Sequence, residues 1–167
     1  MITTLWLLFW LLVCGTLQVL APAWRHLGHP AFPFLLGVVL YTAFNKKRRY
    51  FIAAALLAAV LEDSLSLAPL GCSALAFLVA GGAAVGLRAG FHTDKVRTWI
   101  VAGGICSALA TGVMALVLRT KGLTMPTAGD IWTRMLGAAI LGAVLMPLLF
   151  WAMRAMEKLL GIWEDRD

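Results

Sequence analysis

The residues of this sequence best suited to chemistry are two adjacent acids, Glu62 and Asp63. They interrupt a strongly apolar stretch, with YFIAAALLAAV shortly before them and CSALAFLVAGGAAVGL shortly after. A charged carboxylate near the centre of a bilayer costs about 2.5 kcal/mol or more, so an acid inside a membrane segment is usually paired or functional. Adjacent residues of a helix point about 100° apart, and we therefore expect the two acids to meet different surroundings.

The surroundings of these acids have two interpretations. If the acids lie in the outer third of their helix, both carboxylates can reach the outer lipid headgroups. If at least one faces the interior of a helix bundle, its candidate partners are Ser64, Ser66, Ser73, Thr111, Arg119 and Lys121. A proton relay is a weaker explanation, because a relay needs several ionisable groups along a path and no second acid lies in the middle of an apolar segment.

Other patterns typical of catalysis or metal binding are missing. The sequence contains no GxSxG and no HExxH motif. Its three cysteines lie in or beside apolar runs without a CxxC pair, which is typical of small buried hydrophobes. No histidine lies inside an apolar segment, and no basic stretch is interleaved with aromatic residues that could stack on bases. We therefore expect a non-enzyme without a metal, a cofactor or a nucleic-acid partner.

The composition places the chain in a membrane. Of its 167 residues, 62% are hydrophobic and only 13% are charged, and the mean hydropathy is +0.89. An average soluble domain is about a quarter charged, and a soluble fold of this size could not bury so much apolar surface. No Lys or Arg precedes Arg25, so the first apolar run lacks the basic start of a signal peptide and is interpreted as a retained helix. We expect one integral membrane domain over residues 1–167, in contact with the lipid bilayer.

Apolar runs predict an all-α, polytopic bundle of about six transmembrane helices. A spanning helix needs about 20 mainly apolar residues, and the candidate segments are about 3–23, 31–44, 50–68, 70–87, 98–118 and 131–153. The third segment is uninterrupted only from Tyr50 to Leu61, about 18 Å of helix, which is too short for a core of about 30 Å. It reaches a spanning length only if it continues through the two acids. Pro147 lies inside the sixth segment and predicts a kink.

The distribution of basic residues predicts which side the ends of the chain occupy. With six helices, ten of the 14 Lys and Arg residues fall on the side of the two termini, and cytoplasmic loops carry such an excess. Both termini are therefore expected in the cytoplasm. The strongest signal is the basic loop that follows the second segment, which contains Lys46, Lys47, Arg48 and Arg49.

Small residues recur at four-residue spacing in the later segments. They form one ladder of Gly82, Gly86 and Gly90, a second of Gly103, Ser107 and Thr111, and a third of Ala138 and Gly142. Such faces let helix backbones approach closely. We expect them to pack within the bundle, with contact to a partner helix as the alternative.

Part of the sequence resembles a known family. FPFLLGVVLYTAF, a basic turn and then AALLAAVLEDSLSLAPLGCSALAFLVAGGAAVGL are similar to the rod shape-determining protein MreD family, whose second helix opens on a short Pro-bearing segment. The family signature continues with a small-residue helix, an Asp, and a Leu-Gly pair that opens the next helix. Asp63, Leu70 and Gly71 fall on these positions, and the resemblance runs from about residue 5 to residue 90. Glu62 departs from it, since the family usually has an apolar residue there.

The resemblance implies a scaffold of the bacterial inner membrane. MreD-like proteins sit there with MreC, the actin-like MreB, and a RodA-type glycosyltransferase with its penicillin-binding transpeptidase, and they help to organise cell-wall synthesis. Asp63 would then orient a helix–turn–helix corner through hydrogen bonds, or anchor a partner, without doing chemistry. The basic loop and residues 88–97 would face the cytoplasmic filament, and the outer loops would face MreC.

The alternative is a transport subunit. Substrate-binding membrane subunits of energy-coupling-factor vitamin transporters are also small six-helix proteins. Such a protein needs an enclosed polar pocket near the outer side, for which the candidates are Glu62, Asp63, Arg119, Asp130 and Arg134. It also needs a small-residue helix face for its coupling subunit, which the glycine ladders offer.

Overall fold

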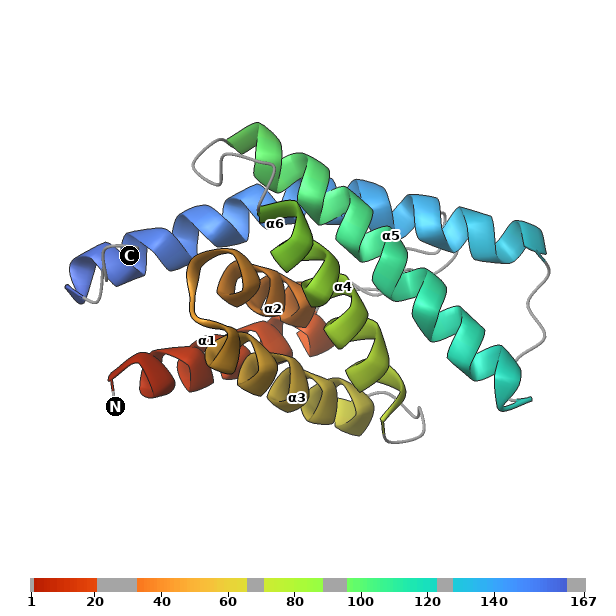
Figure 1. Cartoon of the computed structure of the whole chain (residues 1–167), viewed down its shortest axis with the longest axis horizontal. Helices are drawn as coiled ribbons and strands as arrows, with labels where there is room; N and C mark the ends of the chain where they lie inside the picture. Colours follow the sequence, from red (N-terminus) through yellow and green to blue (C-terminus); the bar gives the residue numbers. More distant parts are fainter. Residues whose placement is uncertain (1, 21–32, 66–70, 89–95, 123–127, 162–167) are drawn as a thin grey trace.

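The computed structural model describes residues 2–20, 33–65, 71–88, 96–122 and 128–161. Within these ranges the chain forms helices and no strand, as the sequence predicted. The helices are α1 (Ile2–Leu20), α2 (Phe34–Asn45), α3 (Arg48–Leu65), α4 (Cys72–Arg88), α5 (Val96–Thr120) and α6 (Ala128–Leu159). The start of α1 and the end of α6 lie at the same end of the molecule (Figure 1).

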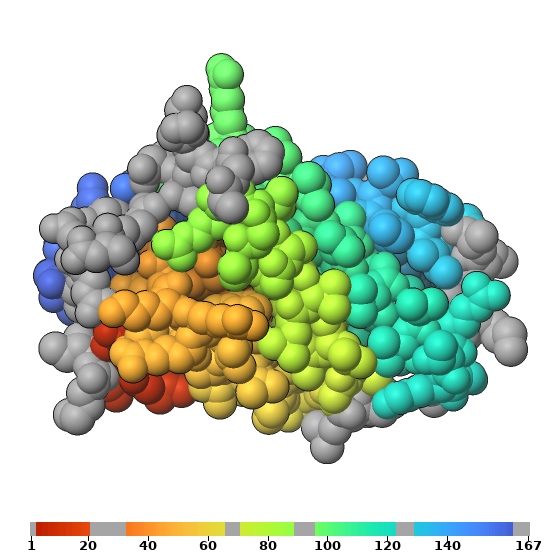
Figure 2. Space-filling view, in the orientation of Figure 1, coloured from red at the N-terminus to blue at the C-terminus, as the bar shows by residue number. Residues whose placement is uncertain are grey.

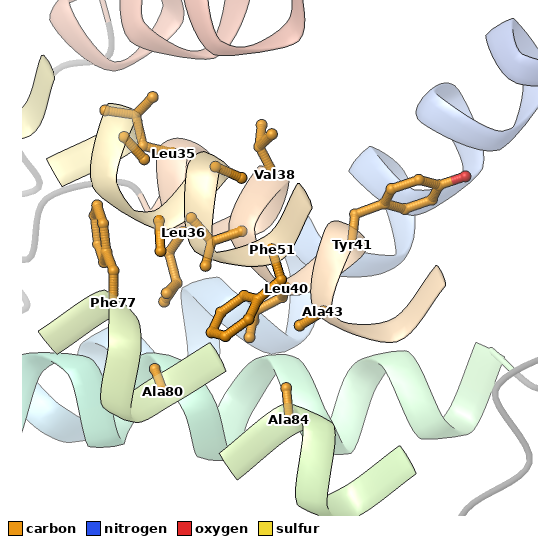
Figure 3. Packing of buried hydrophobic residues seen from close by; sticks show 14 of the residues in the cluster. Leu35, Leu36, Val38, Leu40, Tyr41, Ala43, Phe51, Phe77, Ala80 and Ala84 are labelled. Carbon is orange, nitrogen blue, oxygen red and sulfur yellow. The ribbon is translucent and has the colours of Figure 1, made fainter. Parts of the chain in front are cut away.

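Helix α2 forms the centre of the bundle. It contacts α1, α3, α4, α5 and α6, and every residue from Leu35 to Phe44 is buried. A helix that is apolar all round is stable only when it is covered all round, and FLLGVVLYTAFN contains no charged residue. Figure 3 shows side chains of α2 packed beside Phe77 and Ala80 of α4. The core is therefore built around the shortest of the described helices.

Three helices are long and apolar enough to cross a membrane, over Thr3–Leu20, Val96–Thr120 and Gly129–Leu159. Helices α2 and α4 are apolar but shorter, with 12 and 17 residues. Helix α3 has 18 residues and carries two arginines and two acids. The structure therefore agrees with the predicted number of helices, and three of the six described helices have the length and composition that spanning requires.

The helices differ from the predicted segments mainly at their ends. Helix α3 begins at Arg48, two residues before the predicted start, and continues through both acids to Leu65. Helix α6 continues to Leu159, six residues past the predicted end at 153, because the residues there, AMEKL, are strong helix formers. Pro147 lies inside this helix without ending it. Parts of the predicted segments (21–23, 31–32, 66–68 and residue 70) lie outside the described residues.

Helices α5 and α6 make the most extensive contact between two helices. Their backbones meet at two glycines. A Cβ atom added to Gly142 would lie 2.6 Å from the carbonyl oxygen of Gly103, and one added to Gly103 would lie 2.7 Å from the carbonyl oxygen of Gly142. The side chain of Ser107 packs at the same place. All three residues belong to the predicted small-residue ladders, and here the predicted close packing agrees with the structure.

Within the described residues, Gly82 and Gly86 pack against no other helix, whereas the sequence led us to expect packing within the bundle. Both lie on the exposed side of α4, where an added Cβ atom would meet nothing within 4 Å. Helix α4 instead turns Gly81 toward α3, and the ring of Phe51 fills the space beside it. The spacing of the glycines marked one face of the helix but did not show which face is covered. Their contact with a partner helix stays a prediction, and Gly90 lies outside the described residues.

We expect Gly142→Ala to lower the stability of the bundle, although Ala is normally about 1 kcal/mol better than Gly inside a helix. The added methyl group would press on the backbone of α5, and overpacking of this kind costs about 1–3 kcal/mol. The measurement is thermal unfolding in detergent micelles. The matched control is Gly82→Ala, which gains helix propensity without a clash and should leave the melting temperature unchanged or raise it. A melting temperature of Gly142→Ala as high as that of the control would contradict the close contact.

Candidate functional site

Asp63 holds together the corner between α3 and α4. It lies in the last turn of α3, and only 5% of its surface is exposed. Its carboxylate accepts hydrogen bonds from the backbone N–H of Gly71 at 2.6 Å and of Ser73 at 3.3 Å. The first N–H groups of a helix have no partner within that helix, and a negative charge beside them is favoured by the helix dipole. Asp63 therefore caps the start of α4 from the neighbouring helix.

Gly71 gives this corner its shape. Its φ angle is +96°, a left-handed conformation that glycine adopts without the steric cost that a side chain would bring. The turn carries the chain into α4, which begins at the next residue, Cys72. The spacing of Asp63 and Gly71 in the sequence thus corresponds to a direct hydrogen bond. Leu70, the remaining residue of the family signature, lies outside the described residues.

Glu62 faces a different helix end. The side-chain amide of Gln18, on α1, donates a hydrogen bond to the Glu62 carboxylate. The carbonyl oxygen of the same amide accepts the backbone N–H of Leu35, in the first turn of α2, at 3.4 Å. Glu62 is therefore linked through Gln18 to the start of α2, while its neighbour caps α4. The expectation that adjacent acids meet different surroundings agrees with these contacts.

The other predicted polar partners lie elsewhere. The Ser64 hydroxyl is exposed and donates to the carbonyl oxygen of Val60 in its own helix. Ser73 contributes its backbone N–H rather than its hydroxyl. Arg119 is exposed at the end of α5. Backbone amides, not a cation, therefore hold the Asp63 carboxylate, and Ser66 lies outside the described residues.

The remaining candidate partners and pocket residues do not contact the two acids. Lys121, Asp130 and Arg134 are exposed. Thr111, half-buried on α5, donates its hydroxyl to the carbonyl oxygen of Ser107 within its own helix. The structure therefore brings Glu62 and Asp63 to two helix starts and leaves these other groups apart from them.

A second polar cluster lies at the opposite end of α2. The Lys46 ammonium is 3.0 Å from the carboxylate of Glu157, and the two side chains are 7% and 3% exposed. The Tyr41 hydroxyl donates to the other oxygen of Glu157 at 2.6 Å, and Figure 3 shows this hydroxyl pointing toward α6. The Lys46 ammonium also lies 5.8 Å from the centre of the Trp6 ring, within the range of a cation–π contact. This cluster joins α1, α2 and α6.

The sequence alone did not identify Glu157, although it contained a signal. Glu157 lies beyond the predicted end of the sixth segment, and its partner Lys46 belongs to the predicted cytoplasmic basic loop. On α6, however, Met146, Phe150 and Met153 are buried at spacings of three and four residues. Glu157 occupies the next position of that stripe, so its helical register predicts burial.

The four cations of the basic loop differ in their surroundings. Lys46 is turned inward, whereas Lys47, Arg48 and Arg49 are exposed. The Arg49 guanidinium lies 4.8 Å from the centre of the Tyr50 ring and donates a hydrogen bond of 3.2 Å to its hydroxyl. Arg48 and Arg49 belong to the first turn of α3 rather than to the loop. The basic stretch therefore combines one structural cation with three that face outward.

Both clusters are suited to holding helices in place. The oxygens of Asp63 and Glu157 are in contact with donors that belong to the protein itself. In the part of the chain that the structure describes, no group of three or more His, Cys, Asp or Glu residues could hold a metal ion. The arrangement satisfies helix ends and buried charges, which is a structural role.

Comparison with models of protein families, with curated proteins and with solved structures found no match to this chain. The function is therefore inferred from the residues of the chain and from the geometry of these two clusters.

We expect Asp63→Ala to destabilise the corner between α3 and α4. Loss of a capping side chain costs about 0.5–2 kcal/mol, and the amides of Gly71 and Ser73 would lose their acceptor. The measurement is hydrogen exchange of the peptide that covers the start of α4, together with the melting temperature. Ser64→Ala is the matched control, because its exposed hydroxyl bonds only within α3. Unchanged exchange at the start of α4 in Asp63→Ala would show that the cap does not hold this helix.

We expect Lys46→Met to be more damaging than the double substitution Lys46→Met with Glu157→Met. Removing one partner of a buried ion pair leaves an uncompensated charge and costs about 3–5 kcal/mol, whereas replacing both partners with apolar residues is often neutral. The measurement is the free energy of unfolding in detergent for the two single variants and the double variant. Lys47→Met, at an exposed neighbour, controls for the loss of one positive charge. Additive effects of the two single substitutions would contradict the coupling.

Proposed function

We propose that this chain is a non-enzymatic scaffold subunit of the bacterial cell-elongation complex, resembling MreD. The observation that carries the proposal is the hydrogen bonding of Asp63 to the amides of Gly71 and Ser73. Asp63 and Gly71 are the described residues that fall on the family signature. These hydrogen bonds hold α3 and α4 in a fixed arrangement. A fixed arrangement of helices suits a protein that presents a defined surface to its partners.

The location that fits this role is the inner membrane, with the chain crossing it several times. Three helices have the length and apolar composition for crossing. The start of α1 and the end of α6 lie at one end of the molecule, as does the basic loop at the start of α3 (Figure 1). The excess of Lys and Arg at this end supports a cytoplasmic position. MreB would then meet the cytoplasmic end, MreC the outer loops, and the RodA-type glycosyltransferase and its transpeptidase the same assembly.

The placement of the polar groups supports the scaffold more than the vitamin-transport alternative. A substrate pocket needs several polar groups that converge on one space. Asp63 is occupied by backbone amides and Glu62 by Gln18. Arg119 and Arg134 are exposed near the far ends of α5 and α6. The candidate pocket residues therefore do not converge.

The test is a deletion of the gene with complementation, combined with purification of the tagged chain from native membranes. We expect the deletion to round the cells, the wild-type chain to restore rods, and MreC, MreB and the synthase pair to copurify. Asp63→Leu should insert normally and fail to restore shape, while Ser64→Ala should restore it. Rod-shaped deletion cells would overturn the proposal, and so would copurification of a vitamin-sized ligand without these partners.

A further inference from the structure

Among the residues that the structure describes, the exposed cations at the start of α3 have no acidic partner. The described part of the chain contains four acids, Glu62, Asp63, Asp130 and Glu157. Of these, Glu157 alone lies at this end of the bundle, and it is buried against Lys46. Within the described residues, Lys47, Arg48 and Arg49 therefore have no acid beside them.

Arg88 adds a fourth cation from the neighbouring helix. The ring of Phe51 on α3 packs against Gly81 on α4, and the two helices run in opposite directions (Figure 1). Arg88 lies seven residues beyond Gly81, so it is on the same face of α4 and about 10 Å further along. Arg48 lies three residues before Phe51, about 5 Å in the same direction. Figure 2 shows the first turn of α3 beside the last turns of α4.

An apolar surface begins one turn away from these cations. Ile52, Leu56 and Val60 follow Arg48 at four-residue spacing on α3, and they are 38%, 48% and 57% exposed. Residues four apart form one face of a helix, so the guanidinium of Arg48 stands at the end of an apolar stripe. In a bilayer such a stripe contacts acyl chains, and a basic residue at its end reaches toward the phosphates. The Tyr50 ring beside Arg49 is an amphipathic group of the kind found at that depth.

We infer that Lys47, Arg48, Arg49 and Arg88 bind the phosphate headgroup of an anionic phospholipid whose acyl chains lie along the stripe of α3. A guanidinium binds two phosphate oxygens at once. Helices α3 and α4 together supply three guanidinium groups, those of Arg48, Arg49 and Arg88. The adjoining stripe selects a lipid over a free phosphate, because only a lipid occupies both surfaces. The inference requires that the chain lies in a membrane and is independent of the proposed scaffold role.

The test is native mass spectrometry of the full chain, extracted from bilayers with equal amounts of phosphatidylglycerol and phosphatidylcholine. We expect the wild type to retain phosphatidylglycerol preferentially. In the triple variant Arg48→Gln, Arg49→Gln and Arg88→Gln, the preference should fall by about fivefold for each arginine removed. The matched control is the triple variant Arg119→Gln, Lys121→Gln and Arg134→Gln. It removes three exposed cations near the end of α5 and the start of α6, away from the start of α3. The control should leave the preference unchanged.

A second variant separates a lipid from a free phosphate. Leu56→Ser with Val60→Ser keeps all the cations and makes the exposed stripe polar, so it should weaken retention of phosphatidylglycerol. Glycerol phosphate, which has the headgroup without the chains, should not displace the lipid at millimolar concentration. Equal retention of both lipids by the wild type, an equal loss in the control variant, or full displacement by glycerol phosphate would each overturn the inference.

Discussion

The N–H groups that begin a helix have no partner inside that helix, and in apolar surroundings each unpaired group costs several kcal/mol. In this chain the two adjacent acids of α3 meet that requirement at two different helices. Asp63 accepts the amides of Gly71 and Ser73 directly, while Glu62 reaches the amide of Leu35 through Gln18. The rest of the bundle depends on this arrangement, because it fixes where α2 and α4 begin relative to α3.

Helix α2 is held at both of its ends by polar groups from other helices. Gln18 and Glu62 lie at its start, and Glu157 binds Tyr41 and Lys46 near its end. Between these clusters every residue is buried and the packing is apolar. Apolar packing is not directional, so the polar clusters determine the position of α2 along its axis. Helix α2 itself, with 12 residues, contains no charged residue.

The sequence predicted the parts of this structure that depend on local patterns. Hydropathy predicted six helices, and the short apolar run before the acids required α3 to continue through them. The close approach of Gly103 and Gly142 followed from their small size. The sequence did not predict which groups from distant segments contact each other. Gln18 and Glu62 are 44 residues apart, and Tyr41 and Glu157 are 116 apart. The same limit explains why the spacing selected Gly82 although Gly81 makes the contact with α3. Spacing alone does not distinguish a covered helix face from an exposed one.

The lengths of the helices differ greatly around the bundle. Helix α6 has 32 residues and α5 has 25, which correspond to about 48 Å and 38 Å. Helices α3 and α4, with 18 and 17 residues, reach only about 27 Å and 26 Å. In a bilayer, α5 and α6 would be longer than the hydrocarbon core is thick, whereas α3 and α4 would be shorter. Tilting of the long helices or local thinning of the bilayer beside the short ones relieves this mismatch. A membrane around the protein would therefore differ in thickness between the two flanks. Neighbouring membrane proteins would respond to this difference through the lipid, without direct contact with this protein.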